Sequence, residues 1–215
     1  MSLPGELRVV DHVPRAFADL VRETTPPTFV LSGGDTAREC YELLSVADMD
    51  WSGVSVLFGD ERWVPVGDPD SNEGTARHAF LDNVRPREIH SLREAGPTIE
   101  EAAANYDARL RRLGGLDFVH LGLGPDGHTC SLFPGSPSLQ ERDRLVIPTG
   151  DDKHPHPRLT FTYPALELAR LAVFTVQGAG KKDALARIER GDDLPAAHVR
   201  AYRVIWLADA AATGA

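Results

Sequence analysis

A glycine-rich segment places a carboxylate and an imidazole two residues apart, and this pair is the clearest sign of chemistry in the sequence. Asp126 and His128 lie in Gly124-Pro-Asp-Gly-His128, shortly after the apolar run Leu116–Leu121. A neighbouring carboxylate fixes the tautomer of an imidazole and raises its basicity, which suits general-base catalysis near neutral pH. A lone histidine is more often structural, but glycines and an aspartate around it at a strand end favour a catalytic role.

Other mechanisms find less support in the same segment. Gly122, Gly124 and Gly127 match the dinucleotide-binding pattern G-x-G-x-x-G, but Pro134 and Gly135 exclude the helix that should follow. The sequence contains no G-x-S-x-G motif, so a serine nucleophile is not favoured.

Two earlier segments carry groups that suit a binding site. Ser32, Gly33 and Gly34 precede a helical pattern, where paired glycines let the backbone approach a ligand and the helix N-terminus favours an anion. The same residues also fit a plain tight turn. Asp60-Glu61-Arg62 follows a buried apolar run, and three consecutive charges there suit a site better than packing, although a surface ion-pair cluster stays open.

Basic residues at two later junctions could complete an anion site. Arg158 begins an apolar run, and Lys181 and Lys182 begin a helical pattern. Cations at a helix N-terminus oppose the helix dipole, so a bound anion would relieve an unfavourable arrangement. Alternatively, both lysines are simply solvated.

The elements that must position these residues alternate between strands and helices. Seven short runs predict strands: Thr28–Leu31, Val54–Phe58, Leu116–Leu121, Leu145–Ile147, Leu159–Thr162, Leu171–Val176 and Arg203–Leu207. Amphipathic helical patterns separate many of them, one of which starts at a Thr98-x-x-Glu101 capping box. This alternation predicts one domain over residues 1–215 with a doubly wound, Rossmann-like α/β fold, in which helices cover both faces of a mostly parallel sheet. Ligands of such sheets bind beyond the carboxyl ends of the strands.

Composition limits the classes of partner. The 215 residues include 23 Lys and Arg against 32 Asp and Glu, so the formal net charge is −9, which argues against a nucleic-acid partner and against a basic membrane-binding surface. Two cysteines, no signal-peptide pattern and no apolar run of about 20 residues predict a cytoplasmic protein. His154 and His156 lack a third ligand at metal-binding spacing, so we expect a solvent loop rather than a metal site there.

Taken together, these motifs resemble the 6-phosphogluconolactonase family, in the superfamily that also contains glucosamine-6-phosphate isomerase/deaminase. The matching blocks are Ser32-Gly-Gly34, Gly59-Asp-Glu-Arg-Trp-Val-Pro65, Asp70-Ser-Asn-Glu-Gly74, Gly124-Pro-Asp-Gly-His-Thr-Cys-Ser-Leu-Phe-Pro-Gly135, Arg158-Leu-Thr160 and Gly178-Ala-Gly-Lys181. The fourth block is the most specific, because the deaminase branch looks like Asp-Gly-His-Ile-x-Phe-Asn-Glu-Pro there.

The resemblance implies hydrolysis of 6-phospho-D-glucono-1,5-lactone to 6-phospho-D-gluconate, in the oxidative pentose phosphate pathway, with no metal and no organic cofactor. It implies that His128 activates the attacking water, that Asp126 orients His128, and that Arg62 stabilises developing negative charge or binds the phosphate. The implied substrate-binding residues are Ser32, Gly33, Gly34, Arg158 and Lys181 around the phosphate, Asn72 beside the sugar, and Asp60.

One position departs from the family pattern. Asp35 stands where the family usually has Ser or Thr, and a carboxylate next to a phosphate is repulsive unless it turns away, so we expect Asp35 to cap the following helix. Two other functions stay open: an isomerase or deaminase reaction with Asp60 or Glu61 as base, and non-catalytic binding of a sugar phosphate. The expected partner is a small phosphorylated sugar lactone, and the expected assembly is a monomer or a weak homo-oligomer.

Overall fold

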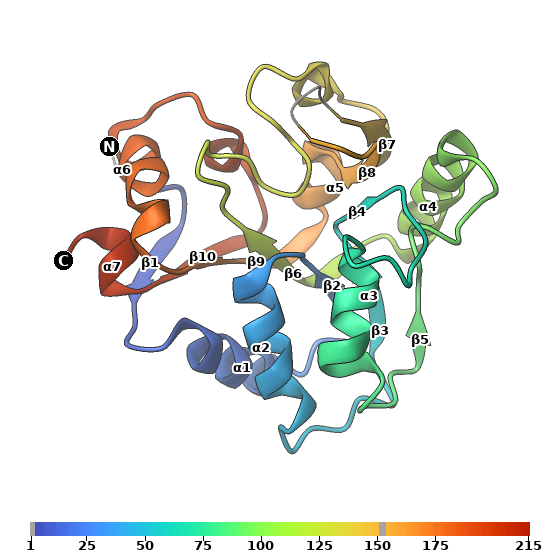
Figure 1. Cartoon of the computed structure of the whole chain (residues 1–215), viewed down its shortest axis with the longest axis horizontal. Coiled ribbons are helices and arrows are strands. Elements are labelled where there is room, and N and C mark those ends of the chain that lie inside the picture. Colours follow the sequence, from blue (N-terminus) through green and yellow to red (C-terminus); the bar gives the residue numbers. More distant parts are fainter. Residues whose placement is uncertain (1–2, 151–153) are drawn as a thin grey trace.

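The computed structural model describes residues 3–150 and 154–215, and a seven-stranded parallel sheet lies at its centre (Figure 1). The order of its strands is β1-β10-β9-β6-β2-β3-β5. The strands are β1 (Glu6–Val9), β2 (Thr28–Leu31), β3 (Ser55–Phe58), β5 (Glu88–Ile89), β6 (Leu116–Gly122), β9 (Ala169–Val176) and β10 (Arg203–Ala208). Every residue of β2 and β3 is buried, because helices cover both faces of the sheet. The predicted doubly wound, mostly parallel sheet is confirmed.

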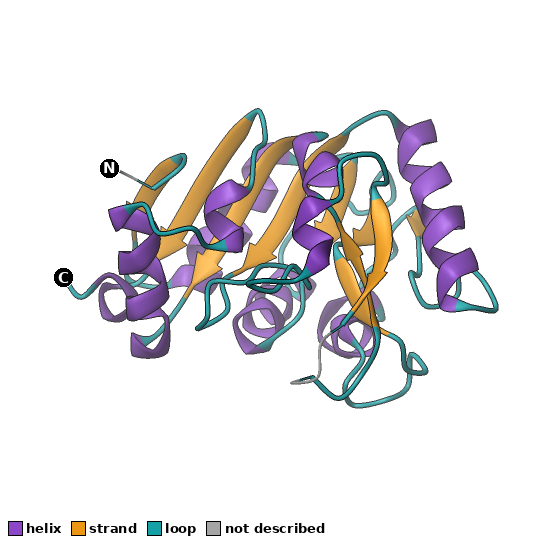
Figure 2. Ribbon diagram, turned by 90° about the horizontal axis from the view of Figure 1, so that it is seen from above, coloured by secondary structure: helices purple, strands orange, loops and turns teal. Residues whose placement is uncertain are grey.

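The helices form one layer on each side of this sheet (Figures 1 and 2). In Figure 1, α1, α2 and α3 lie below the sheet, and α4, α5 and α6 lie above it. The helices are α1 (Val13–Thr24), α2 (Asp35–Ser45), α3 (Asn72–Ala76), α4 (Ile99–Leu113), α5 (Tyr163–Glu167), α6 (Lys182–Arg190) and α7 (Ala210–Thr213). Thr98 caps α4 as the sequence predicts, since its hydroxyl accepts a hydrogen bond from the Glu101 backbone N–H and donates one to the Glu101 carboxylate, both at 3.2 Å. Within the described residues, no helix is both long enough and apolar enough to span a membrane.

A second, smaller sheet corrects part of the sequence-based prediction. The runs expected near residues 145–147 and 159–162 do form strands, β7 (Val146–Thr149) and β8 (Arg158–Phe161), but these strands lie outside the parallel sheet. They pair antiparallel with β4 (Asp60–Arg62) in the order β4-β8-β7. The sequence does not predict β4, because three charged residues carry none of the apolar pattern by which a strand is recognised.

The strand order fixes where a ligand can bind. From β2 the chain continues to β3 on one side of the sheet, whereas from β6 it continues to β9 and β10 on the other. The point at which the order reverses therefore lies between β2 and β6, and the loops that follow their carboxyl ends diverge there. In doubly wound sheets this divergence leaves a crevice for a ligand.

Candidate active site

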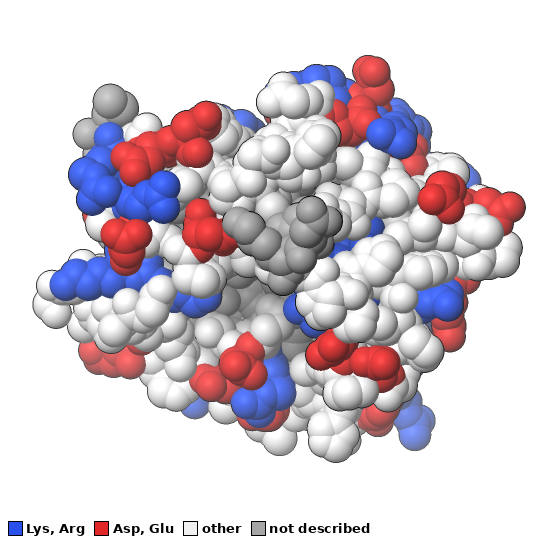
Figure 3. All heavy atoms as spheres, turned by 45° about the horizontal axis from the view of Figure 1, so that its top comes forward, with Lys and Arg blue, Asp and Glu red and all other residues white. Residues whose placement is uncertain are grey.

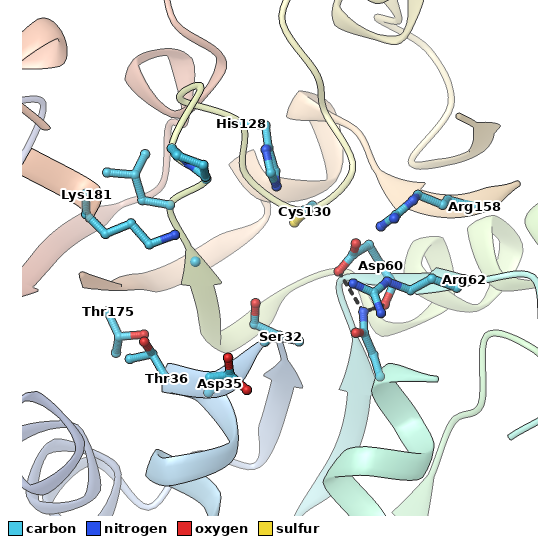
Figure 4. A pocket seen from close by; sticks show the side chains of 18 residues that line it. Ser32, Asp35, Thr36, Asp60, Arg62, His128, Cys130, Arg158, Thr175 and Lys181 are labelled. Carbon is cyan, nitrogen blue, oxygen red and sulfur yellow. Dashed lines mark hydrogen bonds between the residues drawn. The ribbon is translucent and has the colours of Figure 1, made fainter. Parts of the chain in front are cut away.

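A pocket lies at the reversal point and collects residues from segments far apart in the sequence (Figure 4). Of the ten residues to which the family resemblance assigns a catalytic or substrate-binding role, nine line the pocket: Ser32, Gly33, Gly34, Asp60, Arg62, Asn72, His128, Arg158 and Lys181. The tenth, Asp126, does not line the pocket but contacts His128, which does. The structure thus brings the predicted groups together, while their roles in catalysis stay predictions.

His128 and Asp126 form a hydrogen-bonded pair in a tight turn. His128 Nδ1 lies 2.6 Å from Asp126 Oδ1, and the His128 backbone N–H donates to the same oxygen at 3.1 Å. Because a carboxylate can only accept, the Nδ1 atom carries the proton, which leaves Nε2 as the ring nitrogen able to act as an acceptor. Burial raises the pKa of Asp126, but the hydrogen bonds and the charge of His128 outweigh it, so that pKa lies below its usual value. The His128 side chain projects into the pocket, where Nε2 is its possible acceptor atom (Figure 4).

Two glycines give this turn its shape. Gly127 has a φ of +90°, which side chains rarely tolerate, and its N–H donates to the Gly124 carbonyl at 3.0 Å. A Cβ atom at Gly124 would overlap His128 Nδ1 and lie 2.8 Å from Asp126 Oδ1. The absence of a side chain at Gly124 is therefore a condition for the pair to form.

The buried carboxylate of Glu61 binds the segment 71–73 next to the pocket. Its carboxylate accepts hydrogen bonds from the backbone N–H groups of Arg62, Asn72 and Glu73 at 2.7–2.8 Å, and from the Ser71 hydroxyl at 3.0 Å. Burial raises the pKa of Glu61, and these four hydrogen bonds oppose that rise because they favour the ionised form. Sequence reasoning placed all three charges of this segment in one group, but Glu61 points into the protein while its two neighbours line the pocket.

The Glu61→Gln variant is expected to lower the free energy of unfolding by about 2–4 kcal/mol, because an amide NH₂ replaces an acceptor that faces backbone donors. Urea denaturation measures the change. The exposed Glu94→Gln variant is the matched control and should unfold within about 0.5 kcal/mol of wild type. A Glu61→Gln variant as stable as that control would contradict the role assigned to this carboxylate.

Asp60 is fixed on the pocket wall by side chains of two other segments. The Ser131 hydroxyl donates to Asp60 Oδ2 at 2.6 Å, and Asn72 Nδ2 lies 3.3 Å from Oδ1 and 3.1 Å from the Asp60 carbonyl. Asn72 packs closely on Gly33, where a Cβ atom would overlap its amide. These hydrogen bonds hold the Asp60 carboxylate in one orientation on the pocket wall, where it can accept a hydrogen bond from a ligand.

Three cations reach the pocket from two sides. Arg62 and Arg158 are paired residues of β4 and β8, so the small sheet presents both of them together, whereas Lys181 lies on the opposite side (Figure 4). Lys181 follows a turn that Asp209 anchors, since the Gly178 N–H donates to the Asp209 carboxylate at 3.0–3.1 Å. Burial lowers the pKa of Lys181, and the negative charge of Asp126 partly offsets this.

The beginning of α2 corrects the expectation for Asp35. The helix begins at Asp35 itself, Gly34 is the N-cap residue, and no side chain caps the helix. Asp35 lines the pocket rather than closing the helix end. The backbone N–H groups of the first turn consequently have no capping side chain.

Cys130 stands in the pocket wall with a strained backbone. Its φ is +49°, one of two positive values among described residues other than glycine. Burial raises the pKa of its thiol well above the ordinary value, with a smaller contribution from the charge of Asp60. The thiol therefore stays protonated at neutral pH, which disfavours a role for Cys130 as a nucleophile.

The two late histidines lie beside the site rather than in open solvent. His156 Nε2 lies 2.8 Å from Asp70 Oδ2, and the His154 ring stacks on Phe133 with centroids 4.4 Å apart. The expected loop also includes Asp151, Asp152 and Lys153, which lie outside the described residues. Across residues 3–150 and 154–215, no group of three or more His, Cys, Asp and Glu side chains is arranged to hold a metal ion.

Comparison with known proteins shows the family of the chain. The family model described as glucosamine-6-phosphate isomerases/6-phosphogluconolactonase matches residues 6–206. The chain belongs to this family. The 6-phosphogluconolactonase of Nostoc sp. is 41% identical over 204 residues, covering 86% of this chain and 82% of that one. The human 6-phosphogluconolactonase is 38% identical over 169 residues, covering 72% and 65%.

Solved structures of the family share the fold. The crystal structure of 6-phosphogluconolactonase from Thermotoga maritima superposes with a TM-score of 0.81 at 26% identity, covering 95% of this chain and 99% of that one. A monomeric glucosamine-6-phosphate deaminase superposes with a TM-score of 0.83 at 17% identity, covering 97% and 99%, which is a likeness of fold alone. Both branches of the family therefore use this architecture, and fold does not separate them.

Sequence reasoning missed several residues of the pocket. Thr36 and Thr175 line it with their hydroxyl-bearing side chains, and Cys130 lines it with its thiol. Thr36 directly follows the glycine pair and could have been found from that position. Thr175 lies inside an apolar strand, where nothing in the local pattern distinguishes it from a core residue.

Proposed function

We propose that the protein hydrolyses 6-phospho-D-glucono-1,5-lactone to 6-phospho-D-gluconate, as a 6-phosphogluconolactonase of the oxidative pentose phosphate pathway. Family membership and relatives of that name at 38–41% identity support this activity. The observation that carries the proposal is the His128–Asp126 pair, whose free Nε2 faces a pocket with three cationic side chains. A general base opposite cations suits attack of water on the carbonyl of a phosphorylated lactone.

His128 acts as general base and then as general acid. Its Nε2 atom removes a proton from water while the water oxygen attacks C1 of the lactone, and the carbonyl electrons move onto oxygen. When the tetrahedral intermediate collapses, the bond from C1 to the ring oxygen breaks and His128 returns the proton to that oxygen. Asp126 keeps the ring in the required tautomer, and the positive charge of Arg62 stabilises the oxyanion.

The phosphate lies over the loop that follows β2. Gly33 and Gly34 expose backbone there, the first turn of α2 supplies uncapped N–H groups, and Lys181 and Arg158 approach from opposite sides. The remaining predicted residues, Ser32, Asp60 and Asn72, supply hydroxyl, carboxylate and amide groups to the phosphate and the sugar. These side chains suffice for hydrolysis of an activated ester, so we propose no metal and no organic cofactor.

A direct assay separates this function from its rivals. Freshly generated lactone, followed by the appearance of acid, should disappear faster with the protein than without it. Ammonia release from glucosamine-6-phosphate should stay at background, and its appearance would favour the deaminase reaction instead. Binding of 6-phosphogluconate without any lactone hydrolysis would favour a non-catalytic sugar-phosphate-binding domain.

The Lys181→Met variant is expected to raise the KM for the phosphorylated lactone by about 10–100-fold, because a charge-assisted hydrogen bond to phosphate is lost. Its rate with glucono-1,5-lactone, which has no phosphate, should hardly change. The neighbouring Lys182 is exposed and absent from the pocket, so Lys182→Met is the matched control. Equal losses with both substrates would contradict phosphate binding by Lys181.

We further propose that the protein works in the cytoplasm as a monomer or weak homo-oligomer, without nucleic-acid or membrane partners. The net charge of −9 supports the exclusion of polyanionic partners. Figure 3 shows acidic and basic side chains interspersed on one face rather than a continuous basic surface. A small phosphorylated sugar needs only the local cations of the pocket.

A further inference from the structure

A chain of buried polar groups runs beneath the pocket, and its two central members, Tyr41 and His120, are not used by the mechanism above. The Ser32 backbone N–H donates to the Tyr41 hydroxyl at 2.7 Å. That hydroxyl lies 2.9 Å from His120 Nδ1, and His120 Nε2 lies 2.9 Å from Thr175 Oγ1. All four residues are buried, and both ends of the chain, Ser32 and Thr175, line the pocket.

The sheet register explains how this chain is built. His120 and Gly122 of β6 pair with Val173 and Thr175 of β9, so His120 and Thr175 lie on the same face of the sheet. Gly122 has no side chain between them. On this face the ring of Phe17 from α1 lies against His120 with centroids 4.0 Å apart, and Tyr41 comes from α2.

The imidazole of His120 is neutral, so its two nitrogens have opposite roles. Burial lowers the pKa of His120 to about 3, far below physiological pH. A neutral imidazole donates through one nitrogen and accepts through the other. Tyr41 and Thr175, on either side of it, can each donate or accept. Two arrangements of the protons therefore satisfy the same heavy-atom positions.

In the first arrangement, His120 Nδ1–H donates to Tyr41, whose own hydroxyl donates to the Ser32 carbonyl 3.1 Å away. The Thr175 hydroxyl then donates to Nε2 and presents only lone pairs to the pocket. In the second arrangement, Tyr41 donates to Nδ1 and His120 Nε2–H donates to Thr175. The Thr175 hydroxyl hydrogen is then free to point into the pocket.

We propose that His120 is a positioning residue whose tautomer a bound phosphate selects, so that Thr175 becomes a hydrogen-bond donor to the phosphate. The inference rests on the phosphate site of the proposed function. Thr175 lies on the same side of the pocket as Lys181 and Thr36 (Figure 4). An anion at this place repels the lone pairs of the first arrangement and is bound by the hydroxyl hydrogen of the second.

The change of the His120 tautomer also alters the hydrogen bonding of the loop that follows β2. When the Tyr41 hydroxyl turns its hydrogen to His120, the Ser32 carbonyl loses that donor while the Ser32 N–H keeps its bond to Tyr41 oxygen. Phosphate bound at one end of the chain therefore changes the hydrogen bonding of the backbone at the other end. His120 acts through Thr175 and Tyr41 and touches no substrate itself.

Nitrogen NMR of the ring measures the tautomer directly. The full chain is labelled with ¹⁵N-histidine, assigned, and titrated with inorganic phosphate at pH 7.5. Protonated and unprotonated ring nitrogens resonate far apart, so the expected spectrum of the phosphate-saturated protein has a protonated Nε2 and an unprotonated Nδ1 at His120. A protonated Nδ1 at saturation overturns the proposal, as does the absence of any phosphate effect on pocket resonances.

Two substitutions at Thr175 provide a functional test. Thr175→Val keeps the shape but removes the hydroxyl, so the KM for the phosphorylated lactone should rise about tenfold or more while kcat stays within about threefold. Thr175→Ser restores the hydroxyl and should restore the KM. An unchanged KM in Thr175→Val overturns the proposal.

The NMR experiment needs no turnover, so its result is independent of the proposed activity. A protein that shows the Nε2–H tautomer with phosphate but does not hydrolyse the lactone would refute the activity and support the role of His120. Lactone hydrolysis with an Nδ1–H tautomer at phosphate saturation would do the reverse.

Discussion

A His128→Asn variant is expected to lose about 10²–10⁴-fold in kcat while it keeps its fold and its affinity for phosphate. Asparagine has no nitrogen lone pair that can take a proton at neutral pH, so the water that His128 Nε2 would activate has no base. The measurement is the steady-state rate on freshly generated lactone, after subtraction of spontaneous hydrolysis.

The control for this variant is His78→Asn, because His78 is exposed and absent from the pocket lining. It should show the wild-type rate. Thermal unfolding of both variants should stay close to wild type, since the His128 side chain makes its hydrogen bond within its own turn, to Asp126. A His128→Asn variant with wild-type kcat would remove His128 from the mechanism.

The second large effect is expected at Gly124. A Cβ atom there overlaps His128 Nδ1 and approaches Asp126 Oδ1, so Gly124→Ala must push the imidazole away from its carboxylate. A displacement of about 1 Å in a catalytic group can cost about 10²-fold in rate, and we expect a loss of kcat of at least that size. The variant adds a methyl group and removes no catalytic atom.

Gly115→Ala is the matched control for Gly124→Ala. Gly115 lies just before β6, whereas Gly124 lies just after it, and Gly115 has no positive φ. The atom nearest to a Cβ added at Gly115 is the Leu168 carbonyl oxygen, 3.9 Å away. Its activity should equal that of wild type. If Gly124→Ala kept full activity, the contact between the imidazole and the carboxylate would have no catalytic importance.

The parts of the site that lie on apolar strands with glycine turns could be predicted from local sequence. β2 has the predicted bounds Thr28–Leu31, and β6 extends the predicted run by one residue to Gly122. The turns after these strands place Gly33 and His128 in one pocket because parallel strands end at the same edge of the sheet. The local sequence pattern and the rules of parallel sheets therefore suffice to predict that the loops after β2 and β6 form part of the site.

The remaining parts depend on contacts between residues distant in sequence. β4 contains only charged residues, and its pairing with β8 across about 100 positions brings Arg62 opposite Arg158. His120 lies in an apolar run, and its partner Tyr41 is 79 residues away. Strand register and side-chain partners of this kind leave no periodic signal in a single sequence.

The positive φ of Cys130 has a consequence for how stability is distributed over the molecule. A residue with a side chain in the left-handed region raises the energy of the folded state by about 1 kcal/mol or more, and glycine would avoid that increase. The loop that carries His128 therefore contains a position, Cys130, at which the folded state is less stable than it would be with glycine in the same backbone conformation. Natural proteins commonly give up stability where activity needs a particular arrangement of side chains, and Cys130 lines the pocket of the proposed activity. Attempts to make the protein more heat-resistant should accordingly begin away from this loop, because a substitution that raises stability at Cys130 also alters the wall of the pocket.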